Sequence, residues 1–203
     1  MSKLDINPKA KGLIFDLDGT ITDSMPIHFI AWRNAAARFG IDFTPELFDQ
    51  LAGIPLYPTV EVLNKMFGKN MDPVVVGDAK ENEYEVNMHM AVPIEPVVSL
   101  IKKYHGVLPM AIGTGSQRRL ALKALDIIGL KDYFQIIVSS DDVVNHKPHP
   151  DTFLKCAELM GIEPEYCQVF EDGVPGIQAA KKAGMMLTDV REYYKVSIGK
   201  EVY

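Results

Sequence analysis

The chain has 203 residues, of which 47% are hydrophobic and 24% charged, a balance typical of a soluble globular protein with one sizeable core or a core and a small second domain. With 21 Lys and Arg against 27 Asp and Glu, its net charge of -6 argues against a nucleic-acid-binding surface, and no apolar run approaches the ~20 residues that cross a bilayer. Its two cysteines, Cys156 and Cys167, provide no disulfide framework, and the first residues lack a signal-peptide pattern, so we expect a cytoplasmic protein.

The first predicted element is a short apolar strand over residues 12–15. Two acids one residue apart, Asp16 and Asp18, follow it directly, and Gly19-Thr20 comes next. In a parallel sheet, the carboxyl end of such a strand opens into the crevice where these folds bind ligands. Neighbouring carboxylates repel each other unless a cation or a proton separates them. The pair therefore indicates a metal ion, a reaction, or both.

A helical module without strands is predicted from Met25 to about Val92. Ser24 is placed to cap a helix with apolar residues at helical spacing, and Thr44 to cap another. The stretch 53–58, with its glycine and two prolines, is a break, and helical periodicity follows it.

Strands and helices then alternate to the end of the chain. Apolar strands are predicted at 108–112, 134–138, 167–170 and 186–190, and helices at 96–104, 118–128, 151–160 and 175–183. This alternation is typical of a parallel α/β sheet. We therefore expect a Rossmann-like core from residues 1–24 and 93–203, with residues 25–92 inserted as a small helical domain. The tail 191–203 has no interpretable pattern.

Polar residues gather where the predicted strands end. They are Asp16, Asp18, Thr114, Ser116, Lys147, Glu171 and Asp172. If the strands are adjacent, one crevice holds four carboxylates, hydroxyl groups and an ammonium. Such oxygen ligands suit Mg2+, which prefers a few carboxylates, waters and substrate phosphate. Lys147 would oppose the metal with a tetrahedral anion between them, an arrangement that favours phosphoryl transfer.

These segments resemble the haloacid dehalogenase superfamily of phosphohydrolases over nearly the whole chain. Its four motifs are matched in order by Asp16-Leu-Asp18-Gly-Thr20, Thr114, Lys147-Pro148 and Glu171-Asp172. The helical insert looks like the small cap domain of the subgroup with β-phosphoglucomutase and several sugar phosphatases. The stretches 109–116 and 169–172 look closest to bacterial fructose-1-phosphate phosphatases of broad sugar-phosphate specificity.

The resemblance implies roles for individual residues. Asp16 would be the nucleophile that forms an aspartyl-phosphate, and Asp18 the general acid and base. The phosphate would be bound by Thr114, Gly115, Ser116 and Lys147. Mg2+ would be held by Asp16, the carbonyl of Asp18, Glu171 and Asp172, with Glu171 acting directly or through water. In the cap, which would close over the crevice, His28 and the loop at Gly53 would face the substrate.

A sugar phosphatase is therefore expected, acting on a small phosphorylated metabolite as a monomer or weak dimer. The main alternative is β-phosphoglucomutase, which needs a second anion site. The family's mutases have an arginine after the cap glycine turn and a lysine just after the second motif. Here Gly53-Ile-Pro-Leu56 and Ser116-Gln117 lack both charges, although Arg118 or Arg119 could substitute. Thr20 also follows the phosphatase pattern.

A phosphate-accepting receiver module is a second alternative. Receivers lack an insert after the phosphoacceptor strand and an acid like Asp18 followed by Gly-Thr, so the segment 25–92 argues against one. Dehalogenase activity is disfavoured because Asp18 and the acidic fourth motif suit a metal-bound phosphate.

Overall fold

The computed structural model describes residues 4–194 of the chain. It divides into two compact units, described here one at a time. The first takes in the residues up to Asp23 and those from Val92 onward, and the second comprises Ser24–Ala91.

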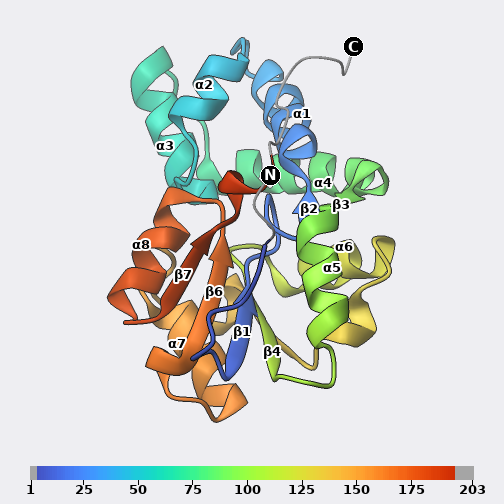
Figure 1. Cartoon of the computed structure of the whole chain (residues 1–203). Helices are drawn as coiled ribbons and strands as arrows, with labels where there is room; N and C mark the ends of the chain where they lie inside the picture. The colour runs from blue at the N-terminus through green and yellow to red at the C-terminus, as the bar shows by residue number, and fades with distance from the viewer. Residues whose placement is uncertain (1–3, 195–203) are drawn as a thin grey trace. The chain divides into compact units, whose positions relative to one another are not determined.

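The first unit is built on a five-stranded parallel sheet, which confirms the predicted fold class (Figure 1). Its strands are β1 (Gly12–Phe15), β4 (Met110–Gly113), β5 (Ile136–Val138), β6 (Cys167–Glu171) and β7 (Met186–Asp189), in the order β5-β4-β1-β6-β7. The chain runs from β1 through β4 to β5 on one side, and from β6 to β7 on the other. The direction of winding therefore reverses between β1 and β6, the point where such sheets bind ligands.

The central strand β1 is apolar because both of its faces are covered. Leu13, Ile14 and Phe15 are all completely buried, as expected for an inner strand of a parallel sheet. The ring of Phe15 stacks on that of Phe170 with centroids 4.8 Å apart. Burying each such side chain contributes about 2 kcal/mol to folding, so the strand that bears Asp16 is firmly held.

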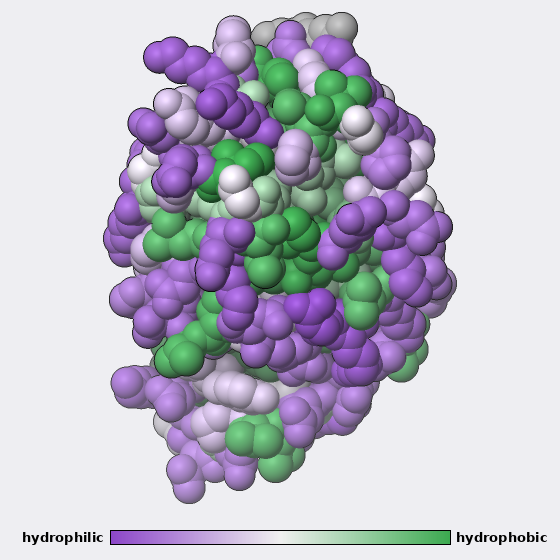
Figure 2. Space-filling model, turned by 90° about the horizontal axis from the view of Figure 1, so that it is seen from below, coloured by the Kyte–Doolittle hydropathy of each residue, from purple (hydrophilic) through white to green (hydrophobic). Residues whose placement is uncertain are grey.

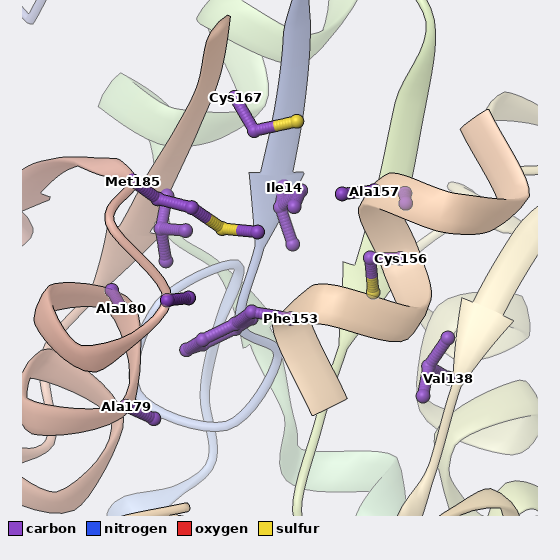
Figure 3. Close-up of a cluster of buried hydrophobic side chains, with 12 residues drawn as sticks. Ile14, Val138, Phe153, Cys156, Ala157, Cys167, Ala179, Ala180 and Met185 are labelled. Atoms are coloured by element: carbon purple, nitrogen blue, oxygen red, sulfur yellow. The ribbon is translucent and has the colours of Figure 1, made fainter. Parts of the chain in front are cut away.

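Four main helices accompany this sheet. They are α5 (Glu95–Tyr104), α6 (Arg118–Ile127), α7 (Asp151–Met160) and α8 (Val174–Lys182). Side chains from α7 and α8, including Phe153 and Ala179, pack against Ile14 and Val138 of the sheet (Figure 3). Cys156 belongs to this cluster, and both cysteines of the chain are buried free thiols.

Short 3-10 helices complete the two units. They are η1 (Met88–Met90), η2 (Lys131–Tyr133), η3 (Ser140–Asp142), η4 (Pro164–Tyr166) and η5 (Val190–Glu192). Strand and helix ends elsewhere differ from the predicted ones by one or two residues, as end residues usually do.

The second unit consists of helices around an aromatic and aliphatic core. The helices are α1 (Met25–Ala37), α2 (Pro45–Gln50), α3 (Leu56–Phe67) and α4 (Pro73–Asn87). Trp32 lies in this core and stacks on Phe43 with ring centroids 5.8 Å apart. The Thr44 side chain accepts a hydrogen bond from the Leu47 amide, so the predicted cap of α2 is confirmed.

Two local predictions in this unit are wrong. The Ser24 side chain does not cap α1, because its backbone is already near-helical (φ -104°, ψ -4°) instead of extended. The predicted break 53–58 is shorter, because α3 begins at Leu56 and includes Pro58. A proline is tolerated in the first turn of a helix, where its missing N–H has no partner to lose.

A two-stranded antiparallel pairing marks where the chain leaves and re-enters the first unit. Strand β2 (Thr22–Asp23) pairs with β3 (Val92–Pro93), with Thr22 opposite Pro93 and Asp23 opposite Val92. Val92 therefore belongs to a strand, and the last helical residue before it is Met90.

The surface seen from below in Figure 2 is a mosaic of hydrophilic and hydrophobic side chains, with the hydrophobic patches bordered by hydrophilic ones. Within residues 4–194, no helix combines the length and apolar character needed to cross a membrane.

Candidate active site

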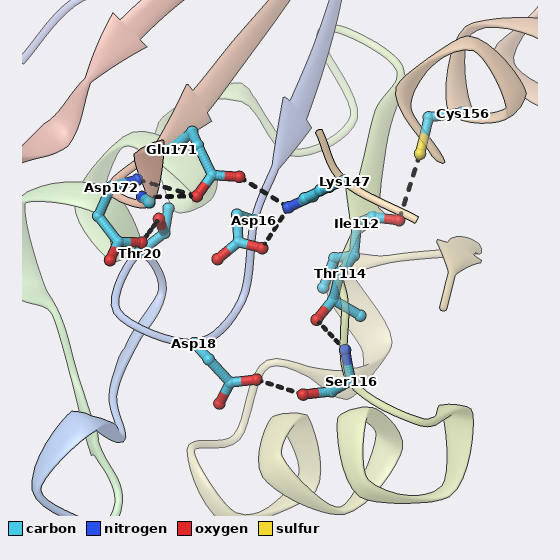
Figure 4. A network of polar contacts seen from close by, with 11 residues as sticks. Asp16, Asp18, Thr20, Ile112, Thr114, Ser116, Lys147, Cys156, Glu171 and Asp172 are labelled. Carbon is cyan, nitrogen blue, oxygen red and sulfur yellow. Dashed lines mark hydrogen bonds and ion pairs between the residues drawn. The ribbon is translucent and has the colours of Figure 1, made fainter. Parts of the chain in front are cut away.

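Three charged side chains from distant parts of the chain meet at the carboxyl edge of the sheet (Figure 4). Asp16 follows β1, Glu171 ends β6, and Lys147 comes from the loop between β5 and α7. The Lys147 Nζ donates hydrogen bonds to Asp16 Oδ1 and to Glu171 Oε2, each at 2.7 Å. The two carboxylates are 6% and 3% exposed, so this ammonium is held in a largely dry environment. The sheet thus brings together residues from three of the four predicted motifs.

The Glu171 side chain folds back onto the start of α8. Its Oε1 accepts hydrogen bonds from the backbone amides of Asp172 (3.1 Å) and Gly173 (2.8 Å), while Oε2 accepts from Lys147. The carboxylate passes so close to Gly176 that a Cβ at that position would overlap it. Glycine at 176 therefore leaves the space in which Glu171 makes these contacts. Both carboxylate oxygens of Glu171 accept hydrogen bonds.

Asp172 is oriented by the turn that follows Asp18. The Thr20 hydroxyl donates a hydrogen bond to Asp172 Oδ1 at 2.7 Å. Gly19 has a positive φ of 86°, and a Cβ there would collide with the Asp172 carboxylate. Only glycine combines this backbone conformation with so close an approach. The Gly-Thr pair that follows the first motif thus positions an acid of the fourth motif.

Asp16, Glu171 and Asp172 form a group that could hold a metal ion, with one carboxylate oxygen of each within 4.8 Å of the others. Burial and the charges of Glu171 and Asp172 raise the pKa of Asp16 well above its usual range, although Lys147 opposes this. Burial and the Glu171 charge raise the pKa of Asp172 to about 7.

Lys147 does not balance this cluster by itself. Burial lowers the pKa of its ammonium, but the charges of Asp16 and Glu171 more than offset that effect, so the pKa is raised and the group stays protonated. Three carboxylates then face one ammonium, which leaves an excess of negative charge in a poorly solvated place. A divalent cation on these oxygens would neutralise that excess, so the donor set fits a hard metal ion.

The acid Asp18 lies apart from this group and contacts the loop after β4 (Figure 4). The Ser116 hydroxyl donates a hydrogen bond to Asp18 Oδ2 at 2.5 Å. The Ser116 amide in turn donates to Thr114 Oγ1 at 3.0 Å. The first and second motifs are therefore joined through Ser116. Gly115 lies between these residues with nothing within 4 Å of the position that a Cβ would take.

A second charged network lies at the end of β5. Asp142 Oδ2 accepts hydrogen bonds from the Ser139 amide and hydroxyl and from Arg118 Nη2, the last at 2.7 Å. The same Arg118 nitrogen also donates to the carbonyl of Ile137 at 2.8 Å. Arg118, a candidate for a second anion site, therefore has one guanidinium nitrogen, Nη2, engaged in internal contacts.

The two residues predicted in the helical insert lie in the second unit. The His28 ring stacks on Tyr84 with centroids 4.1 Å apart, and its Nδ1 is 3.0 Å from the ammonium of Lys80. Gly53 has a positive φ of 83° in the turn after α2. The role of His28 and Gly53 toward a substrate stays a prediction.

The structure also shows contacts that the sequence reasoning missed. From sequence, Thr20 has only a place in the first motif and the phosphatase pattern, and its bond to Asp172 depends on a turn that no spacing reveals. The sequence indicates phosphate binding for Ser116, but not its bond to Asp18. The stretch 191–203 has no interpretable pattern, yet Tyr194 is half-buried.

Comparison with known proteins bears on what this arrangement does. The model of the haloacid dehalogenase-like hydrolases matches residues 13–190, a span that includes all four motifs. The chain belongs to this family. The protein is therefore an enzyme, and the resemblance inferred from the motifs is confirmed.

Individual members of the haloacid dehalogenase-like family are similar along most of the chain. The fructose-1-phosphate phosphatase YqaB of Escherichia coli is 41% identical over 180 residues, covering 89% of this chain and 96% of that protein. The β-phosphoglucomutase of Bacillus subtilis is 31% identical, covering 89% and 83%. Among solved structures, the β-phosphoglucomutase of Clostridium difficile superposes with a TM-score of 0.77 at 26% identity, covering 88% and 83%.

Proposed function

We propose that the protein is a Mg2+-dependent phosphatase that hydrolyses small sugar phosphomonoesters through an aspartyl-phosphate on Asp16. The observation that carries the proposal is the position of Asp16, whose carboxylate contacts Lys147 and belongs to the acidic group with Glu171 and Asp172. A buried carboxylate between an ammonium and a cation-binding group is placed to attack an electrophilic phosphorus whose charge both sides neutralise. The sugar-phosphatase relative at 41% identity supports this choice of chemistry.

The carboxylates of Asp16 and Asp172 and the carbonyl of Asp18 would hold Mg2+. Glu171 would act through a water, because backbone amides and Lys147 already occupy both of its oxygens. When bound, the metal supplies positive charge that offsets the phosphoryl oxygens.

In the first half-reaction, an Asp16 oxygen forms a bond to phosphorus while the bond from phosphorus to the sugar oxygen breaks. Lys147 balances the phosphoryl charge, and Thr114 with the amides of Gly115 and Ser116 binds the phosphoryl oxygens. Asp18 gives its proton to the departing sugar oxygen. In the second half-reaction, Asp18 takes a proton from a water that attacks phosphorus, which releases phosphate and restores Asp16.

Phosphoglucomutase activity is the alternative, and two of the similar proteins are named for it. A mutase must hold a second phosphate while the first is transferred. Arg118, a candidate for that site, donates its hydrogen bonds to Asp142 and to the Ile137 carbonyl, which supports hydrolysis.

The deciding experiment incubates the protein with β-glucose 1-phosphate and a trace of glucose 1,6-bisphosphate, and with a panel of other hexose phosphates, each with and without Mg2+. We expect inorganic phosphate from several sugar phosphates, only when Mg2+ is present. Formation of glucose 6-phosphate would assign the protein as a mutase instead. A stable phosphoprotein without turnover would favour the receiver-like module.

A further inference from the structure

The chain beyond the last strand returns to the edge of the sheet that bears the acidic group. Strand β7 runs parallel to β6, with Asp189 paired to Glu171, so both strands end at the same edge (Figure 1). The Asp189 carboxylate accepts hydrogen bonds from the Arg191 amide at 3.1 Å and from Arg191 Nε at 2.8 Å. Val190 is completely buried. These contacts fix the turn η5, and Tyr194 follows two residues after it.

The Tyr194 hydroxyl oxygen is buried, and it has no hydrogen-bond partner among residues 4–194. Within this range, Asp23 Oδ1 is the other buried side-chain oxygen that has no hydrogen-bond partner. Buried polar groups in native proteins are nearly always satisfied, and one that has no protein partner generally contacts a water or an ion. Both oxygens belong to the first unit.

The surroundings of Tyr194 indicate which water or ion is concerned. Burial raises the pKa of the Tyr194 phenol, and four nearby carboxylates raise it further, so the hydroxyl stays neutral. In decreasing order of effect they are Asp172, Asp16, Asp23 and Glu171. Three of these four form the group that could hold a metal, yet none makes a direct hydrogen bond to the phenol. Tyr194 follows the end of β7, where Asp189 pairs with Glu171, and its hydroxyl makes no hydrogen bond to any of the three acids.

We propose that Tyr194 is a positioning residue whose hydroxyl oxygen accepts a hydrogen bond from water bound to the Mg2+ of this site. This inference rests on the metal dependence in the proposed function. Mg2+ usually keeps several waters when carboxylates bind it. A metal-bound water directs its lone pair to the cation and donates both of its hydrogens outward, and the phenol oxygen is an acceptor for one of them. Groups in this outer layer orient the ligands and strengthen metal binding.

The test titrates Mg2+ into the full-length protein, without substrate, and measures heat of binding for the wild type, Tyr194→Phe and Tyr193→Phe. Tyr194→Phe removes one oxygen and little else, and its half-buried neighbour Tyr193 provides a matched control. We expect Tyr194→Phe to weaken Mg2+ binding about 10-fold or more, the usual effect of losing an outer-layer partner. Tyr193→Phe should bind as the wild type does.

Thermal unfolding with and without Mg2+ shows whether Tyr194→Phe is folded. Without metal, Tyr194→Phe should unfold at or above the wild-type temperature, since it buries no unsatisfied hydroxyl. Mg2+ should raise its unfolding temperature by less than it raises that of the wild type. Wild-type Mg2+ affinity in Tyr194→Phe would overturn the inference and leave the phosphatase proposal intact. So would a higher KM for sugar phosphate with unchanged Mg2+ affinity, because Tyr194 would then contact substrate. A wild type that binds no Mg2+ would defeat both proposals.

Discussion

Two acidic clusters at the same edge of the sheet behave in opposite ways. Around Asp16 and Asp172, burial and mutual repulsion raise the carboxyl pKa values, that of Asp172 to about 7. At the end of β5, burial raises the pKa of Asp142, but the hydrogen bonds from Ser139 and Arg118 together outweigh burial and lower the pKa to about 2. The first cluster has one ammonium, that of Lys147, for three carboxylates, whereas the carboxylate of Asp142 is satisfied by its internal hydrogen bonds. An acid at a strand end is thus a candidate site only where the protein leaves its charge uncompensated.

The largest effect is expected from Asp16→Asn, which replaces the carboxylate that we propose attacks phosphorus. An amide does not attack phosphorus, so phosphate release should fall to background. The variant should unfold at or above the wild-type temperature, because it also removes a buried charge that neighbouring carboxylates repel. Phosphate release and thermal unfolding are measured on the same preparation; retained turnover would remove the nucleophile assignment.

Lys147→Met removes the ammonium and so increases the excess of negative charge around Asp16. In the wild type, Lys147 Nζ lies 4.6 Å from the centroid of the Phe153 ring, and methionine keeps an apolar side chain over that ring. We expect kcat to drop by about 10²–10³-fold, as when a donor to developing charge is lost. The loss of stability relative to the wild type should be larger at pH 8 than at pH 5. At pH 5, carboxyl groups with raised pKa values are protonated and no longer repel each other. Equal destabilisation at both pH values would contradict this account.

Ser116→Ala tests the contact that joins the second motif to Asp18. If Ser116 orients Asp18 as the proton donor, kcat/KM for a sugar phosphate should fall about 10-fold, at the low end of what acid-base catalysis contributes. p-Nitrophenyl phosphate needs little help from an acid, because its leaving group is stable as an anion, and should be hydrolysed nearly as before. Ser116→Thr restores the hydroxyl and serves as the control. Equal losses on both substrates would indicate that Ser116 binds phosphate only.

The smallest effect is expected from Asp142→Asn, in the satisfied cluster. Its folded-state pKa is about 2 against an ordinary value of 3.8, so its carboxylate stabilises the fold fully above pH 4 and loses that effect as the pH falls toward 2. Because the Asp142 side chain is still 22% exposed and solvent screens its charge, the loss of stability at pH 7 should be only about 1 kcal/mol. The unfolding temperatures of the wild type and Asp142→Asn should therefore differ at pH 7 and converge as the pH falls to 2. A difference in unfolding temperature that stays constant across this range would show that the charge of Asp142 does not stabilise the fold.

The strands and helices that hydrophobic burial determines were mostly predictable from the sequence. The strand before Asp16 and the helix Asp151–Met160 were found because apolar spacing reports a covered strand or one buried face of a helix. The convergence of Asp16, Lys147 and Glu171 followed from parallel strands whose ends share one edge.

Contacts that depend on side-chain direction were not predictable in this way. Ser24 is a good capping residue by type, yet its backbone angles exclude the cap. Ser116 contacts Asp18 across 98 positions of sequence, and the Tyr194 hydroxyl is buried at the edge of the sheet by a turn after β7. Neither has a periodic pattern, because each depends on the folded path of a loop.

The absence of a side chain at Gly176 links the stability of α8 to the chemistry at its first turn. Glycine within a helix costs about 1 kcal/mol relative to alanine, so a designer seeking a more heat-resistant protein would replace it first. Here the added methyl group would occupy the volume of the Glu171 carboxylate and push it from its two amides and from Lys147. At this position an alanine that favours the helix would disturb the contacts of Glu171 with the two amides and with Lys147.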